Sequence, residues 1–438
     1  MRRVRMLVFT LVIASLFAMA SMGPALAQEK VKLTYWSWGV GPWEAMYEGF
    51  QEEFPNIEIT FEEYAVTDVY AKLTTAVAAG TGAPTMCAIE CDRMLVYMPT
   101  GLLAPLDDEM APYIDDFPEF LIANNSYGGH LYGIPQDVGP CGLFYRADVF
   151  DEYGFPAPRT MAHFKAQGEA LKAAQAAKGI NPEDLEYIYY TGFNAVDEGA
   201  HFLMMLINSL GGQLFRLEDG KYVSALDSPE ALKAMKFMKE MADAGTAYTG
   251  AMWSDDWCAM NTQGLVATTL GASWYGSWAL KQWLSMGEGN EGNWRIAAWP
   301  QWTLDVKTGA NWGGSEVCTL TQSTEAERAA AWEFHKYCLI DNVVEAVFVQ
   351  ASCTPAYLPG AEDPLITASD PYFGGQAMTK LLMDEMAYIP PMEYTGYFDL
   401  FMTNAQTAAE KVLLQGVSPE EALTEAVDII NADIALRG

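Results

Sequence analysis

The sequence predicts an α/β fold with two lobes around a central ligand cleft. Between residues 32 and 90 it alternates strand, helix, strand, helix and strand, which is the order of a parallel sheet with helices on its faces. A second series of helices and strands follows from residue 142, and 438 residues are enough for two hydrophobic cores. Segments rich in Gly and Pro separate the two series at several places, so we expect the chain to leave one lobe and later to return to it.

The elements of the first series are predicted from apolar periodicity. Alternation with period two, as in Ile57, Ile59 and Phe61, indicates a strand with one buried face, whereas spacings of three and four indicate helices. Ligands of parallel sheets bind beyond the carboxyl ends of the strands, which here points to residues 37–39, 63–64 and 91–93. The predicted strands are 32–36, 57–62 and 85–90, and the predicted helices are 43–54 and 68–79.

Residues 128–146 are predicted to carry the chain from one lobe to the other. Leu131–Pro135 and Cys141–Tyr145 have the composition of two short apolar strands, and a loop of Gln, Asp, Gly and Pro separates them. This arrangement suits a segment that leaves one lobe and enters the next.

In the rest of the chain, several helices are predicted from residues typical of a helix start. Ser228 before Pro229 is an N-cap followed by Pro in the first turn, and Thr324 with Glu327 forms a capping box. A second crossing is expected at residues 300–311. The predicted elements are the helix Thr160–Lys178, a helix from Pro229 to Gly245, strands Leu265–Leu270 and Trp294–Trp299, a helix from Glu325 to Leu339, and a last helix that starts at Ser418.

The first 27 residues are predicted to be a cleaved signal peptide. Three arginines precede the apolar run Met6–Ala20, and Ala25-Leu26-Ala27 has the small residues of a cleavage site. An uncleaved membrane anchor would need a longer apolar run. We therefore expect cleavage after Ala27, a periplasmic mature protein and no membrane span after cleavage.

The charge balance excludes one class of partner. Removal of the three arginines of the leader takes the net charge from −32 to −35. Nucleic acid binding requires basic patches, so we expect no nucleic acid partner.

The cysteines and histidines give no sign of a metal or cofactor site. The seven cysteines include Cys87 and Cys91, whose spacing is compatible with a disulfide bond or a metal site. Cys87 falls in an apolar strand, which favours buried structural cysteines. None of the four histidines has a partner at metal-ligand spacing. We expect neither a cofactor nor a metal.

Tryptophan is the strongest functional signal. Several indoles stand at the ends of elements or beside Gly, where a side chain can face a cleft, and flat indole faces suit the apolar faces of sugar rings. The alternative for each indole is packing in a core. Trp274, in the sequence Gly-Ala-Ser-Trp-Tyr-Gly after a strand, favours the cleft. The indoles in question are Trp36, Trp38, Trp253, Trp257, Trp274, Trp278 and Trp312.

These motifs together resemble the extracytoplasmic solute-binding proteins of ABC importers, in the carbohydrate-binding family 1 of maltodextrin- and multiple-sugar-binding proteins. Asp92-Arg93 followed by Gly101-Leu102-Leu103-Ala104 is similar to an element that binds sugar hydroxyls in that family. Residues 264–274 are similar to the segment whose Trp stacks on a sugar, and residues 312–315 resemble the return to the first lobe. The family places an aromatic residue three positions before the Asp, where this chain has Ile89.

The resemblance implies a two-lobed, type II periplasmic-binding-protein-like fold with three hinge crossings, at about residues 135–142, 300–311 and 351–359. It implies a first lobe of residues 28–137 plus 310–352 and a second lobe of 142–303 plus 360–438. The function it implies is capture of a mono- or oligosaccharide by a monomer that delivers it to the transmembrane subunits of an ABC permease. The ligand-binding residues expected are Trp38, Glu63, Asp92, Arg93, Asp137, Asp255, Trp274, Tyr275, Trp312 and Tyr357.

Two other functions remain open from the sequence. An exported glycosidase needs two carboxyl groups that face one glycosidic bond, and neighbouring acids such as Asp255 and Asp256 do not supply that geometry by themselves. A binding protein for a polyol or glycerol-phosphate ligand would have a more ionic site. We expect no enzyme activity.

Overall fold

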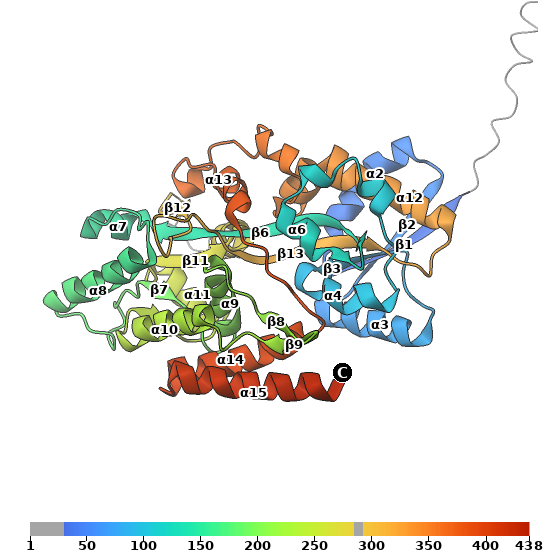
Figure 1. Cartoon of the computed structure of the whole chain (residues 1–438). Helices are drawn as coiled ribbons and strands as arrows, with labels where there is room; N and C mark the ends of the chain where they lie inside the picture. Colours follow the sequence, from blue (N-terminus) through green and yellow to red (C-terminus); the bar gives the residue numbers. More distant parts are fainter. Residues whose placement is uncertain (1–29, 284–291, 438) are drawn as a thin grey trace, which may run out of the picture.

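The computed structural model describes residues 30–283 and 292–437. The expected signal peptide and its cleavage site lie outside these residues. Figure 1 shows two groups of helices, with the strands β6 (Ile134–Arg146) and β13 (Asn311–Thr319) running between them. The two-lobed arrangement predicted from the sequence is therefore confirmed.

The first lobe is built on the predicted parallel strands. β1 (Val31–Ser37) lies between β2 (Ile57–Glu63) and β3 (Met86–Glu90), and both neighbours run parallel to it. The helices α2 (Gly41–Glu53) and α3 (Val66–Ala79) connect them, as expected from the apolar spacing. Other elements on this side are α4 (Met94–Tyr97), α5 (Asp107–Met110), α6 (Glu119–Asn124), β4 (Ser126–Tyr127), β5 (His130–Leu131) and α12 (Glu325–Lys336).

The crossing at residues 134–146 is one continuous strand, so the prediction of two short strands around a loop was wrong. The first part of β6 pairs with β13 and with β14 (Thr354–Pro355), and its second part pairs with β11 (Thr268–Ala272) and β12 (Trp294–Ala298). The polar residues that suggested a loop are hydrogen-bonded: the amide of Gln136 donates to the Ser315 hydroxyl at 3.1 Å.

Gly139 explains how β13 can lie so close to β6. A Cβ atom at residue 139 would stand 1.9 Å from the carbonyl oxygen of Trp312. Glycine at this position serves close backbone approach and is no sign of a turn.

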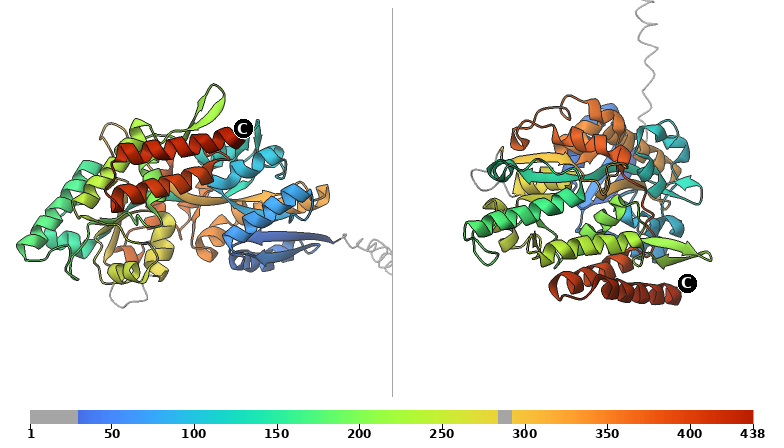
Figure 2. Two further views of the ribbon diagram at one scale, coloured as in Figure 1. Left: turned by 90° about the horizontal axis from the view of Figure 1, so that it is seen from below. Right: turned by 60° about the vertical axis from the view of Figure 1, so that its left-hand side comes forward.

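In the second lobe the predicted cap at Ser228 is confirmed, and Thr160 is a further N-cap. The Thr160 hydroxyl accepts the amide N–H of His163 at the start of α8 (Met161–Ala177), and Ser228 caps α10 (Pro229–Asp243). Figures 1 and 2 show α14 (Phe398–Leu414) and α15 (Pro419–Arg437) side by side on the outside of this lobe. The remaining elements are α7 (Ala147–Tyr153), β7 (Thr191–Gly192), α9 (Gly199–Ser209), β8 (Phe215–Glu218), β9 (Lys221–Ser224), β10 (Ala247–Tyr248), α11 (Asp255–Thr262), a π-helix (Tyr275–Trp283) and α13 (Met378–Glu385).

Each lobe has its own buried core, and the segment after residue 360 contributes to both. Ile366, Met383 and Ile389 pack in the core of the first lobe, together with residues such as Leu33 and Phe50. Met392, Tyr394 and the helices that follow pack in the core of the second lobe. The chain between α13 and α14 is therefore a further connection between the lobes (Figure 1).

All seven cysteines are free, and five of them are buried, as expected for structural cysteines. Within the described residues no helix is both long and apolar enough to span a membrane.

Candidate functional site

Trp274 and Trp312 meet where the two lobes join. Trp274 stands two residues after the end of β11, and Trp312 is the second residue of β13, so both stand near strand ends beside β6. Their rings lie edge to face with centroids 4.7 Å apart, and the Trp274 indole N–H donates to the Trp312 carbonyl at 2.9 Å. The hydrogen bond fixes the orientation of the Trp274 ring, which is partly exposed, whereas Trp312 is buried.

A histidine of the second lobe packs on the Trp312 ring. The His201 ring, on α9, is stacked on the Trp312 ring at a centroid distance of 5.1 Å. The Glu198 carboxylate lies 2.5 Å from Nδ1 of His201 and holds the imidazole in place.

The first lobe brings acids to the same junction. Asp92 and Arg93 follow β3, and the side chain of Cys91 donates to the carbonyl of Gly313 at 3.5 Å, next to Trp312. The Arg93 guanidinium binds the carboxylate of Asp399 on α14 in the second lobe. Residues 91–93, predicted from the ends of parallel strands, therefore do contact the second lobe.

Two partly buried acids at the junction carry raised pKa values. Burial, aided by the charge of Glu90, raises the pKa of Asp92 to about 7, although Arg93 and His201 act in the opposite direction. Burial also raises the pKa of Asp137 to about 6, against the hydrogen bond that it accepts from Ser315. Carboxyl groups poised between the charged and neutral forms can accept or donate hydrogen bonds to hydroxyl groups.

Glu316 is a further buried acid next to this group. Its side chain is fully buried on β13, and burial raises its pKa far above the ordinary value, with Asp137 and Asp92 adding to the effect. Sequence reasoning missed Glu316 because it falls within an apolar strand.

Trp38 and Glu63 lie at the neighbouring strand ends of the first lobe. Trp38 follows β1 and packs partly buried against the first-lobe core. Glu63 ends β2, is exposed, and accepts the backbone N–H of Val40 at 3.2 Å. Register pairs Ser37 with Glu63, so these two positions share one edge of the sheet, as the strand pattern predicted.

Tyr275 and Tyr357, two further predicted ligand contacts, each pack within one lobe. Tyr275 is 1% exposed in the second-lobe core, because its position in the π-helix turns the ring inward, against Phe144. The Tyr357 hydroxyl donates to Asp116 at 3.2 Å and its ring contacts Phe117, both of the first lobe. Asp255 is exposed in the first turn of α11, between Trp253 and Trp257 in the sequence.

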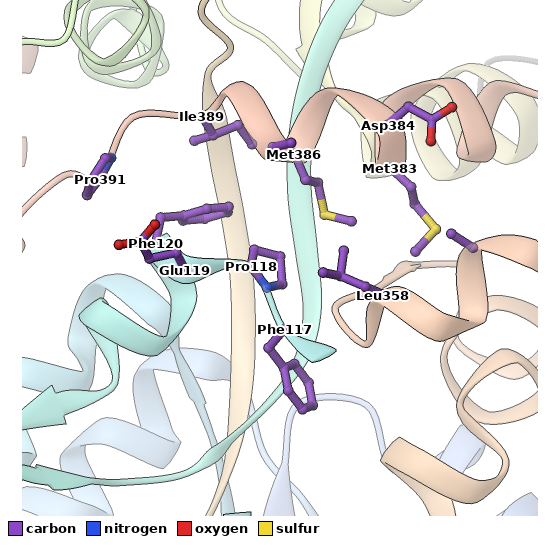
Figure 3. Close-up of a pocket in the computed structure, with 12 residues that line it drawn as sticks. Phe117, Pro118, Glu119, Phe120, Leu358, Met383, Asp384, Met386, Ile389 and Pro391 are labelled. Atoms are coloured by element: carbon purple, nitrogen blue, oxygen red, sulfur yellow. The ribbon is translucent and has the colours of Figure 1, made fainter. Parts of the chain in front are cut away.

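An apolar pocket lies away from these residues. Figure 3 shows it between α6 and the segment that follows α13, with Met383, Met386, Pro118 and Leu358 turned toward one another. Its volume is about 540 Å³. None of the predicted site residues lines it, so we assign it to the joint between the lobes.

Comparison with known proteins decides the family. Residues 45–372 match the family of bacterial extracellular solute-binding proteins. The chain belongs to this family.

Relatives of this solute-binding protein cover nearly its whole length. It is 24% identical over 411 residues to the lactose-binding protein of Rhizobium radiobacter, an alignment that covers 91% of this chain and 92% of the relative. It is 22% identical to the arabinooligosaccharide-binding protein of Halalkalibacterium halodurans, with coverage of 92% and 89%. These relatives are named as binding proteins, and none of these names describes an enzyme.

Solved structures show the same fold. The sugar-binding protein MalE of Xanthomonas citri superposes with a TM-score of 0.77 at 21% identity, over 93% of this chain and 98% of that one. The galacto-N-biose/lacto-N-biose I-binding protein of a Bifidobacterium longum ABC transporter gives a TM-score of 0.74 at 21% identity, with coverage of 93% and 97%. The solute-binding protein therefore has the two-lobed fold of periplasmic sugar-binding proteins.

Proposed function

We propose that this solute-binding protein is the substrate-binding component of an ABC sugar importer. It binds a mono- or oligosaccharide between its lobes and presents it to the transmembrane subunits of the permease. The observation that carries the proposal is that the rings of Trp274 and Trp312 lie against each other where Cys91, the neighbour of Asp92, contacts Gly313 from the first lobe. Indoles offer a stacking face and the carboxyl groups accept hydrogen bonds from hydroxyls, which together suit a neutral, hydroxyl-rich ligand.

The names of the relatives support a saccharide over the other ligands considered. Lactose and arabinooligosaccharides are the ligands in the names of two of them. A glycerol-phosphate ligand would need cationic groups in the site, and Arg93 is already bound by Asp399 and close to Asp92. We therefore place a saccharide first.

The proposed mechanism is closure of the lobes on the ligand. A ligand that contacts both lobes binds the closed arrangement more tightly than the open one, so it shifts the equilibrium toward closure. Trp274 of the second lobe and Asp92 of the first lobe would contact opposite sides of the sugar.

We propose the lobe boundaries expected from the sequence, with one addition. The first lobe comprises residues 28–137 and 310–352, and the second comprises 142–303 and most of 360–438. The packing of Ile366 and Ile389 in the first-lobe core supports sharing residues 360–389 between the lobes. The hinges are then at about 135–142, 300–311 and 351–359, with 389–397 as a further connection.

We propose that the chain is exported to the periplasm after cleavage behind Ala27, acts as a monomer and does not hydrolyse its ligand. Mass spectrometry of the exported protein should give a mature N-terminus at Gln28. Chromogenic glycosides should be stable in its presence. Release of the chromophore that stops on replacement of a junction carboxylate would instead indicate a glycosidase.

A thermal-shift screen tests the proposed function. A ligand that binds only the folded state raises the unfolding midpoint. We expect at least one mono- or oligosaccharide to raise the midpoint, and polyols and glycerol phosphodiesters to leave it unchanged. A shift with the phosphodiesters alone would contradict the proposal.

A further inference from the structure

We propose that Asp399 is a positioning residue for closure: its carboxylate pairs with the Arg93 guanidinium of the other lobe, and this interlobe ion pair stabilises the closed arrangement. The inference rests on the proposed function, because it concerns closure of the same site. It gives Arg93 a different role from its neighbour Asp92. The arginine acts on the closing equilibrium, whereas the acid remains a candidate contact for the sugar.

The first lobe holds Arg93 in a fixed position. Its guanidinium lies over the Tyr70 ring of α3, 5.5 Å from the ring centroid. The Tyr70 hydroxyl donates to the Glu90 carboxylate at 2.9 Å and accepts the Glu90 N–H at 3.0 Å, so the ring is anchored at the end of β3. Asp92 lies 3.6 Å from Nε of Arg93. A guanidinium that is already oriented in this way loses little further freedom when it binds a carboxylate.

The second lobe holds Asp399 equally firmly. It stands in the first turn of α14, next to Phe398. Phe398 is 1% exposed and packs on the rings of Tyr394 and Phe401 in the second-lobe core. The same Phe398 ring lies 5.9 Å from the Arg93 guanidinium. The start of α14 therefore presents both a ring and a carboxylate to one cation of the first lobe.

The ion pair lies beyond the place where the chain changes lobes. Ile389 packs in the first-lobe core, whereas Met392 and Tyr394 pack in the second-lobe core. The chain therefore passes between the lobes before Met392, and Asp399 moves with the second lobe. A rotation that opens the lobes would separate its carboxylate from Arg93.

An apolar contact continues the joint beside the ion pair. Leu95 of α4, two residues after Arg93, packs partly buried against the second-lobe core. Gly396 comes close to it from the second lobe, since a Cβ atom at residue 396 would stand 3.7 Å from the Leu95 carbonyl oxygen. The interlobe ion pair therefore belongs to a contact between two segments, 93–95 and 396–399.

Two other roles for these side chains are considered in the test. Asp399 is 64% exposed in the first turn of a helix, where a carboxylate interacts favourably with the helix dipole whatever lies opposite. That interaction stays within the second lobe, so it contributes to the stability of the fold and not to closure. Direct contact between Arg93 and the sugar is the second alternative, and its contribution would depend on which sugar is bound.

An effect on closure changes the affinity for every ligand in the same way. The apparent affinity of a ligand that binds the closed arrangement is proportional to the closed fraction of the free protein. Loss of the interlobe ion pair lowers that fraction, so it weakens the binding of each sugar by one common factor. Because an exposed ion pair contributes modestly, we expect a factor of about three to five.

The test is Asp399→Asn, which removes the charge and keeps the shape of the side chain. Calorimetric titration should show an affinity loss of about three- to fivefold for every sugar that raises the unfolding midpoint. Stopped-flow tryptophan fluorescence should place the loss in the dissociation rate, since the pair forms only when the lobes close. Raising the salt concentration from about 0.03 M to about 0.5 M should remove most of the difference, because salt screens exposed charges.

Two further variants serve as controls. Glu410→Gln removes one negative charge from the same helix, where the carboxylate accepts the Gln406 amide within the second lobe at 3.0 Å, and it should bind as the wild type does. Arg93→Gln should weaken binding, and adding Asp399→Asn to it should cause no further loss, because the pair is already broken. Unfolding midpoints without sugar show that each variant is folded.

The closed fraction can also be measured without any sugar. Single-molecule energy transfer between dyes on α2 and α8, attached through unnatural amino acids, counts closed molecules of the free protein. The fraction should be lower in Asp399→Asn than in the wild type, and unchanged in Glu410→Gln.

The outcomes separate the inference from the function on which it rests. Wild-type affinity in Asp399→Asn, losses that differ from sugar to sugar, or full additivity with Arg93→Gln would overturn the interlobe ion pair while sugar binding stands. Failure of the wild type to bind any sugar would overturn the proposed function. Energy transfer alone would then decide the inference, and an equal closed fraction in Asp399→Asn and the wild type would overturn it.

Discussion

The indole N–H of Trp274 donates to the backbone carbonyl of Trp312 over 2.9 Å, and this bond joins the end of β11 to the start of β13. The same carbonyl oxygen lies against the Cα of Gly139 on β6. Two strands that run between the lobes, β6 and β13, thus meet β11 of the second lobe at a single peptide group. The proposed stacking residue, Trp274, is part of that contact.

Trp274→Phe should lower the free energy of unfolding by about 1–3 kcal/mol, because the Trp312 carbonyl loses this donor in a largely buried place. Urea denaturation measures the change. Trp332→Phe, at a partly buried indole of the first lobe, serves as the control and should lose less. Equal losses for the two variants would show that the hydrogen bond contributes nothing beyond packing.

Gly139→Ala should disrupt the crossing. The added Cβ would stand 1.9 Å from the Trp312 oxygen and 2.7 Å from its carbonyl carbon, and backbone atoms cannot rotate away. We expect a loss of several kcal/mol, in the range of an overpacked core, and a lower unfolding midpoint. Gly41→Ala is the matched control, since a Cβ there meets no atom within 4 Å. If the two variants unfolded at the same temperature, the close approach of β13 to β6 would be wrong.

Some elements of the fold could be predicted from the sequence, and others could not. The capping box of Thr324 and Glu327 and the Ser228 cap were predicted because their hydrogen bonds are local, and the structure confirms them. The continuity of β6 was missed because Gln136 and Asp137 find their partners 178 or more residues away, on Ser315. Long-range pairing of this kind leaves no local pattern.

In the candidate site, too, residues with a local sequence signal were predicted and residues defined by long-range contacts were missed. The position of Asp92 beyond the end of a parallel strand was predictable from the strand pattern, whereas Trp274 was proposed for the cleft from the Gly-containing segment that follows a strand. His201 was read as structural, since nothing in its helix indicates the Trp312 ring on which it stacks. Tyr275 was misplaced because a π-helix, which changes the direction of each side chain, cannot be told from an α-helix in this sequence.

Asp92→Asn should change how stability depends on pH. The pKa of Asp92 is raised from 3.8 to about 7 in the folded protein. A carboxyl with a raised folded pKa contributes its stability fully below the unfolded value, and this contribution is lost as the pH rises through the folded value. The amide of Asn does not titrate, so the stability of the variant relative to the wild type should increase between about pH 4 and pH 8, by on the order of 1 kcal/mol or more.

Urea unfolding of both proteins across that pH range gives the difference curve, in which other titrating groups largely cancel. Thr407→Ser, on the exposed face of α14, is the control, because neither side chain titrates in this range, and it should give a flat difference. A flat curve for Asp92→Asn as well would contradict a buried acid at the junction of the lobes.

The most direct measurement is calorimetric titration of the best sugar from the thermal-shift screen into the wild type, Trp274→Ala and Asp92→Ala. These variants remove one side chain from each lobe. We expect each to weaken binding by about 30-fold or more, as for a central contact worth about 2 kcal/mol. Wild-type affinity in both variants would contradict the claim that the two lobes hold the ligand between them.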